Sequence, residues 1–223
     1  MKDMFFLKND TTVIQEETIK KDLCDENGRV LVHVNIAYPS INLKEKSRLK
    51  QNAQPFYERS AKNFLHFAEN DLFERAKKLA DKEGFRPCGA VMKFTCSYES
   101  KNILSIYTDI SVFDGISEQN HLRASQVWNK DKGYMYGFND IFAPGAKEFL
   151  LERFASEGNT GVLPTEEYKK ALRKFFVENS FYITEKAVAF FYPAERLGSK
   201  PGVRVFLCDK EPLKEKKLLK VSV

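Results

Sequence analysis

Residues 103–113, which read ILSIYTDISVF, place apolar and polar side chains on opposite faces of an extended strand, and this pattern constrains the fold more than any other feature. The apolar face holds Leu104, Ile106, Ile110 and Val112, and the polar face holds Ser105, Tyr107, Asp109 and Ser111. Strands with a single apolar face are typical of antiparallel sheets. Residues 88–98 form a second candidate strand, joined to the first through a four-residue turn at 99–102. We therefore predict a mainly antiparallel sheet that helices cover on one face only.

The remaining segments mix strands with helices. We predict further strands over residues 12–19, 30–38 and 121–129, with Pro39 ending the second of them. An apolar stripe at helical spacing predicts a long helix over residues 55–82, which Gly84 ends as a C-cap. Two shorter helices are predicted over residues 147–155 and 165–179.

This order of elements indicates the α+β class, with mainly antiparallel sheets, helices packed on one face and two lobes. We predict an N-terminal lobe with the long helix over residues 11–100 and a C-terminal lobe over residues 101–208. Residues 209–223 hold more lysines than acidic residues, so they are predicted to form a solvated, frayed basic tail.

The stretch from Ser180 to Leu207 contains two apolar strands separated by an interruption that is neither apolar nor a tight turn. A polar segment between two core strands usually lies on the surface, where loops carry binding and catalytic residues. The interruption at 193–201 is therefore a candidate functional loop and is not expected to be a core element.

Charge and cysteine usage exclude several classes of function. The 36 basic and 31 acidic residues give a net charge of +5 without a clustered basic stripe, which argues against nucleic acid as a partner. The four cysteines form no C-x-x-C pair and have no histidine at ligand spacing, so we expect neither a zinc site nor a disulfide framework. Cys88 and Cys96 are expected to be buried thiols. No cofactor is predicted.

The apolar run in the N-terminal sequence MKDMFFLKND is too short to form the hydrophobic core of a signal peptide. No run in the chain approaches the ~18 apolar residues that a membrane span requires. As written, the sequence predicts a cytoplasmic protein without a membrane span; an exported or cell-surface protein is the alternative if a leader has been removed.

The common catalytic signatures are absent, because the sequence contains no G-x-G-x-x-G, Walker A, G-x-S-x-G or H-E-x-x-H motif. The strongest catalytic candidate is FDGISEQNH, in which Asp114, Glu118 and His121 could bring a carboxylate near an imidazole for general acid–base chemistry. The simpler interpretation is a surface loop, since Asp114-Gly115 is a common turn sequence and His121 begins a strand. A surface turn is therefore favoured over a catalytic role for this segment.

Trp128, Tyr134 and Tyr136 could form an aromatic platform for a sugar or a peptide. Trp128 shares strand parity with Leu122 and Ala124, which favours a core position for it instead.

Several segments occur in an order that resembles a known family. They are VNIAYPSIN, the long helix, SYESKNILSIYTDISVF, the loop with His121, GFNDIF and FYITEKAVAFFYPAERLG. The order is similar to the paired uncharacterised domains in the ectodomain of the RsiV-type lysozyme-sensing anti-sigma factor and in the N-terminal module of the PdaC-type peptidoglycan deacetylase. His121 in EQNH matches the last residue of a Gly-Gly-Ala-His-type loop of that family, whose glycines are replaced here. A second family loop is matched, in a different order, by Tyr192, Pro193, Glu195 and Gly198.

The resemblance implies an α+β fold and a binding role, with the two loops as the candidate surface. We expect a non-enzymatic module that recognises a protein or a peptidoglycan fragment through Asp114, Glu118, His121, Tyr192, Glu195 and Arg196. The alternatives are a hydrolase that uses His121 with a nearby carboxylate, and a structural or assembly domain. The sequence leaves the oligomeric state open.

Overall fold

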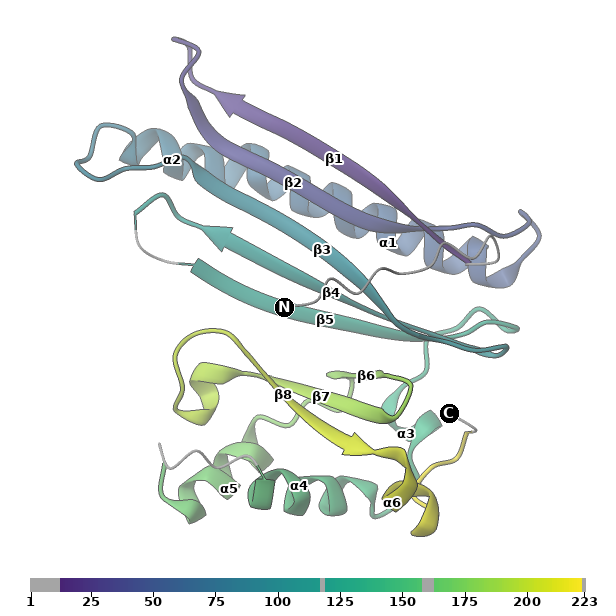
Figure 1. Cartoon of the computed structure of the whole chain (residues 1–223). Helices are drawn as coiled ribbons and strands as arrows, with labels where there is room; N and C mark the ends of the chain where they lie inside the picture. The colour runs from purple at the N-terminus through teal and green to yellow at the C-terminus, as the bar shows by residue number, and fades with distance from the viewer. Residues whose placement is uncertain (1–12, 117–118, 158–162, 222–223) are drawn as a thin grey trace, which may run out of the picture.

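The computed structural model describes residues 13–116, 119–157 and 163–221, which form two sheets with helices beside them (Figure 1). The first sheet holds five strands in chain order, namely β1 (Ile14–Cys24), β2 (Val30–Ile41), β3 (Cys88–Glu99), β4 (Ile103–Phe113) and β5 (Gln119–Asn129). Neighbouring strands are antiparallel except for β2 and β3, which run parallel. The parallel pair is possible because a long helical segment connects these two strands.

That connection is one continuous helical rod along one face of the sheet. It consists of α1 (Arg48–Phe67), the π-helical turn η1 (Ala68–Leu72) and α2 (Phe73–Leu79). The predicted start at Pro55 was too late, because the Ser47 side chain caps the helix by accepting a 3.4 Å hydrogen bond from the Lys50 N–H. Pro55 is tolerated inside the helix on its exposed side, where water can satisfy the carbonyl that loses its partner.

The core between α1 and the sheet includes Trp128 at 3% exposure, which confirms the core position predicted for it. Its indole N–H donates a 2.8 Å hydrogen bond to the Tyr57 hydroxyl on α1. Leu104 and Ile106 pack in the same cluster and are fully buried, as the alternation along β4 predicted. The apolar face of β4 therefore lies towards the helix.

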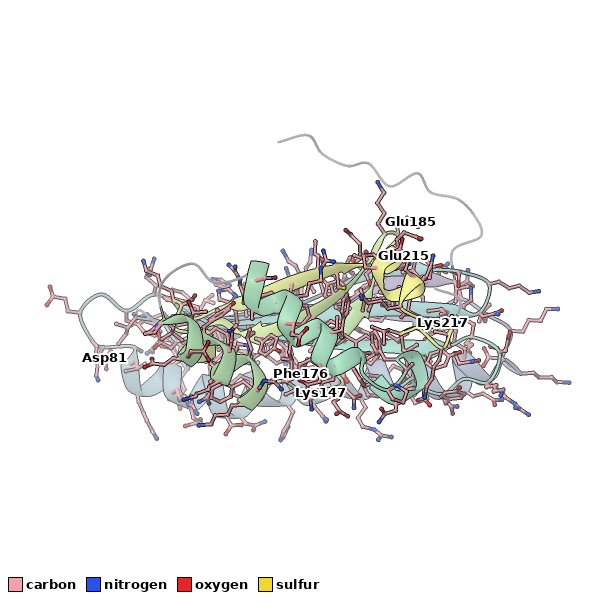
Figure 2. The ribbon with its side chains drawn as sticks, turned by 90° about the horizontal axis from the view of Figure 1, so that it is seen from below. Asp81, Lys147, Phe176, Glu185, Glu215 and Lys217 are labelled. Atoms are coloured by element: carbon pink, nitrogen blue, oxygen red, sulfur yellow. The ribbon has the colours of Figure 1, made fainter. Side chains whose placement is uncertain are left out.

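The second sheet is antiparallel and has the order β6 (Phe181–Ile183), β7 (Ala187–Pro193) and β8 (Val203–Asp209). The other elements of this lobe are α3 (Phe138–Ile141), α4 (Ala146–Glu157), α5 (Thr165–Lys174), the 3₁₀ turn η2 (Ala194–Leu197) and α6 (Lys210–Glu215). Both α4 and α5 lie on the side of this sheet away from the first sheet (Figure 1). Figure 2 shows Phe176 beside Lys147, whose ammonium lies 5.1 Å from the ring centre. Among the described residues, each sheet thus has helices on one face only, and the predicted α+β class is confirmed.

The stretch 180–207 contains three strands and not two. Thr184 closes a turn with Ala187 through a 2.9 Å backbone hydrogen bond, and this turn splits the first apolar run into β6 and β7. The interruption after β7 is η2, in which Leu197 is 3% exposed and belongs to the core of the second lobe. The expectation that this segment contributes nothing to the core was therefore wrong.

Residues 209–221 are not frayed. Lys210 and Leu213 are 4% and 0% exposed, and Leu219 forms a β-bridge with Phe142. The apolar residues spaced among the lysines hold the segment against α3 and α4. The predicted frayed tail was wrong for these residues.

The polar face of β4 and β5 meets the second sheet. The rings of Tyr107 and Tyr182 lie 4.6 Å apart across this contact. The boundary predicted between residues 100 and 101 falls in the β3–β4 turn, and the chain enters the second lobe only after Asn129. Within the part of the chain that the structure describes, no helix is long and apolar enough to cross a membrane.

Candidate binding groove between the two sheets

Where the second sheet ends, the polar face of β4 and β5 continues into a groove of about 340 Å³. The lining residues come from β4, β5, the end of the loop before β8 and the first residue of β8, and they are Asp109, Ile110, Ser111, His121, Leu122, Arg123, Gly202 and Val203. The register places Ser111 opposite His121 and Asp109 opposite Arg123. Strand pairing therefore brings two polar pairs from distant sequence positions to one surface.

Arg123 and Asp109 form a bidentate ion pair in which the guanidinium Nε and Nη2 donate hydrogen bonds of 2.7 Å each to the two carboxylate oxygens. The guanidinium carbon lies 4.2 Å from the centre of the Tyr107 ring, and Nη1 donates a 3.3 Å hydrogen bond to the Tyr182 hydroxyl. Arg123 is only 14% exposed, so this geometry is well suited to holding the two sheets together. Its charge is largely neutralised by Asp109.

His121 is half-buried, and its Nδ1 lies 2.9 Å from the Ser111 hydroxyl oxygen. Depending on the tautomer, the ring nitrogen accepts the hydroxyl proton or donates its own. A hydroxyl bonded to an imidazole resembles the first two members of a nucleophilic triad. Asp109 is the carboxylate that lines this groove, and both of its oxygens already bond to Arg123.

The turn before β5 places Asp114 near the end of β4. Its carboxylate accepts a 2.9 Å hydrogen bond from the Ile116 N–H, as in an ordinary turn. Gly115 has a φ of 94°, and a Cβ at this position would lie 2.8 Å from the Phe85 ring, so glycine is required. Asp114 does not line the groove, and Glu118 lies outside the described residues.

The second predicted loop is only partly available for contacts. Tyr192 is 2% exposed, and its hydroxyl donates a 3.3 Å hydrogen bond to the Leu172 carbonyl, so it is a core residue and not a surface contact. Glu195 and Arg196 are exposed on η2, where the Arg196 guanidinium lies 5.2 Å from the Phe175 ring centre. The chain then reaches the groove at Gly202. The groove thus unites His121 with the end of this loop, but not with Glu195 or Arg196.

Sequence reasoning missed Ser111, Asp109 and Arg123 as groove residues. The alternation along residues 103–113 did place Asp109 and Ser111 on a polar face, and this was the available signal. Parity along residues 121–129 also places Arg123 on the face of His121, but its pairing with Asp109 follows only from the strand register, which the sequence does not specify.

The five-stranded sheet with its helical rod and the three-stranded sheet with its helices define a two-lobed α+β protein. No family model matches the sequence. No curated protein matches it either. Two solved structures have the same fold, and both belong to the DUF3298 family. The protein from Bacteroides fragilis matches with a TM-score of 0.60 and 15% identity over 95% of each chain. The protein from Pseudomonas aeruginosa matches with a TM-score of 0.58 and 13% identity, covering 93% of this chain and 94% of the other.

Proposed function

We propose that this protein is a non-enzymatic binding module that recognises another protein or a cell-wall glycan through the groove at His121. The main support is the groove itself, which joins a polar sheet surface with the loop before β8 in one hollow of about 340 Å³. Its polar groups sit on paired strands and are fixed by neighbours, and such a rigid support is what specific recognition requires. The order of sequence motifs, which resembles that of the RsiV-type and PdaC-type proteins, also supports this role.

A hydrolase is the second candidate, because the 2.9 Å contact between Ser111 and His121 pairs a nucleophile with a base. The binding role is preferred because the groove carboxylate Asp109 is committed to Arg123. Within the described residues, which leave out Glu118, no carboxylate is hydrogen-bonded to the His121 ring, and an imidazole without an orienting carboxylate is a weak general base for serine activation.

Thermal denaturation with candidate ligands tests the proposal, since a ligand that binds only the native state raises the melting temperature. The two probes are a c-type lysozyme and soluble muropeptides. We expect one of them to raise the melting temperature of the natural protein and of His33→Gln, which changes an exposed histidine on β2. Ser111→Arg, which fills the groove, should abolish the shift.

An absence of any shift with both probes would refute the binding role as stated, as would an undiminished shift in Ser111→Arg. The hydrolase alternative predicts ester or amide cleavage that Ser111→Ala and His121→Gln both remove. Cleavage of this kind would replace the binding proposal.

A further inference from the structure

The strand β1 forms one edge of the five-stranded sheet and pairs with β2 on its inner side, as the outermost strand in Figure 1 shows. Among the described residues, no strand or isolated β-bridge occupies its outer edge. Its pairing with β2 is regular from Ile14 to Leu23, and this stretch contains neither proline nor glycine. An open edge of this kind can pair with another chain unless prolines, bulges or repelling charges prevent it.

The charges along β1 reverse their sign at the middle of the strand. Glu16 and Glu17 lie before the middle, and Lys20 and Lys21 lie after it. All four side chains are exposed. Lys21 forms an ion pair with Glu69, but neither Glu16 nor Lys20 has an ion-pair partner within the part of the chain that the structure describes. An edge with charges of one sign repels a copy of itself, whereas this edge carries both signs in separate halves.

The side chains of β1 alternate between the two faces of the sheet. Ile19 lies opposite Ile36, which is fully buried under the helical rod, so the odd-numbered residues of β1 face the rod. Glu16, Thr18 and Lys20 therefore lie on the other face. Two copies that pair antiparallel through this edge are related by a two-fold axis perpendicular to the sheet. Each residue then lies opposite a residue of its own face, and one residue lies on the axis.

The position of the axis decides which charges meet. With Thr18 on the axis, Glu16 of each copy lies opposite Lys20 of the other copy, and no two like charges are opposite each other. Moving the axis to Ile19 sets Glu16 opposite Asp22. Moving it one residue beyond either of these two positions sets two like charges on the axis itself. Opposite charges in facing positions stabilise a strand pair and like charges destabilise it, so the register with Thr18 on the axis is favoured.

We propose that β1 pairs antiparallel with β1 of a second copy of this chain, with Thr18 on the two-fold axis and two Glu16–Lys20 ion pairs fixing the register. Both helical rods then lie on the same face of the joined sheet. Each rod packs on β2, and the two β2 strands are three strand spacings apart, about 14 Å. Packed helices need roughly 8–10 Å between their axes, so the rods do not collide.

The groove at His121 is on β4 and β5, at the opposite edge of the sheet from β1. The dimer therefore leaves both grooves open and places them on one face of the joined sheet. The inference does not depend on the function proposed for the groove.

Sedimentation equilibrium of the full chain from micromolar to millimolar concentration measures the association, and we expect a monomer–dimer equilibrium. Glu16→Lys and Lys20→Glu each replace the two opposite-charge pairs with two like-charge pairs. Each variant alone should dimerise at least about tenfold more weakly than the natural protein. Both positions are exposed, so both variants should keep the natural melting temperature.

A mixture of the two variants tests whether these charges face each other. In a mixed dimer the two lysines of the Glu16→Lys chain lie opposite the two glutamates of the Lys20→Glu chain. The mixture should therefore dimerise about as tightly as the natural protein, and so should the double variant Glu16→Lys/Lys20→Glu. Lys132→Glu makes the same charge change at an exposed residue beside the other edge of the sheet and should leave the dimer unchanged.

Hydrogen exchange locates the interface, because every second amide of β1 points away from β2. These amides should exchange more slowly at high protein concentration than at low concentration. A chain that stays monomeric at millimolar concentration overturns the proposal, as does a dimer that both single variants form with natural affinity. A mixture that associates no better than either variant alone also overturns it, and so does a dimer that protects other strands but not β1.

Discussion

The side-chain hydroxyl of Ser105 on β4 accepts a 2.9 Å hydrogen bond from the backbone N–H of Ile183 on β6. Ser105 is fully buried, and its oxygen also accepts a 3.0 Å hydrogen bond from the Ser97 hydroxyl. On β5, the Ser125 hydroxyl donates a 2.5 Å hydrogen bond to the Phe181 carbonyl. Serines of the first sheet therefore satisfy the free backbone edge of β6, which fixes how the second sheet sits on the first.

Ser105→Ala is expected to destabilise the protein by about 1–3 kcal/mol, because it leaves the buried Ile183 N–H without an acceptor. Chemical denaturation followed by circular dichroism measures the change. Ser60→Ala is the matched control, because that hydroxyl donates a hydrogen bond to the Phe56 carbonyl within its own helix α1 and links no two elements among the described residues. The control should change stability by less than about 0.5 kcal/mol. Equal effects of the two substitutions would contradict the role assigned to Ser105.

Arg123→Lys is expected to lower stability by about 1–3 kcal/mol, because an ammonium cannot reproduce the bidentate pairing with Asp109 together with the contact over Tyr107. The same denaturation measurement applies. Lys21→Ala, which removes an exposed ion pair with Glu69, should cost less than about 1 kcal/mol. The prediction fails if Arg123→Lys is as mild as this control.

The β3–β4 hairpin was the most predictable part of the fold. Residues 88–98 and 103–113 were predicted and the observed strands are Cys88–Glu99 and Ile103–Phe113, because alternation over a long strand is a local signal. The start of α1 was missed because its cap, Ser47, precedes the apolar stripe. The β6–β7 turn was missed because Thr184 closes it without glycine or proline.

The candidate site was predictable only in part. His121 was singled out from its sequence neighbours, but its observed partner is Ser111, and that contact follows from the register of β4 against β5. Tyr192 was assigned to a surface loop, yet it lies on the face of β7 that also carries Phe190. Side chains two residues apart on a strand point to the same face, so a predicted strand that reached Tyr192 would have placed it in the core beside Phe190.

Gly133→Ala should destabilise the protein strongly. Gly133 has a φ of 69°, and a Cβ there would lie 2.4 Å from the Arg48 carbonyl oxygen at the start of α1. Gly28 has a φ of 80° with nothing near its Cβ position, so Gly28→Ala shows the backbone strain alone, about 1–2 kcal/mol. Gly133→Ala should exceed Gly28→Ala by at least about 1 kcal/mol in thermal or chemical denaturation. Similar losses of stability in the two variants would contradict a steric clash between the new Cβ and α1.

Cys96 and Cys24 should differ sharply in their reaction with iodoacetamide. Burial raises the pKa of the Cys96 thiol to about 11, whereas Cys24 is exposed. Only the thiolate reacts, so at pH 8 the Cys96 thiolate should be about a hundredfold scarcer than that of an ordinary cysteine. Mass spectrometry of labelled peptides should show fast modification of Cys24, and slow modification of Cys96 that rises about tenfold per pH unit up to pH 10.

The same shift links stability to pH. A thiol whose pKa is higher in the folded state releases its proton more readily on unfolding, so the unfolded state binds fewer protons between about pH 8.5 and 11. The contribution of Cys96 is fully present below this range and is lost as pH rises through it. Cys96→Ser should therefore reduce the loss of stability between pH 8 and pH 10. Parallel stability curves for the two proteins would contradict the raised pKa.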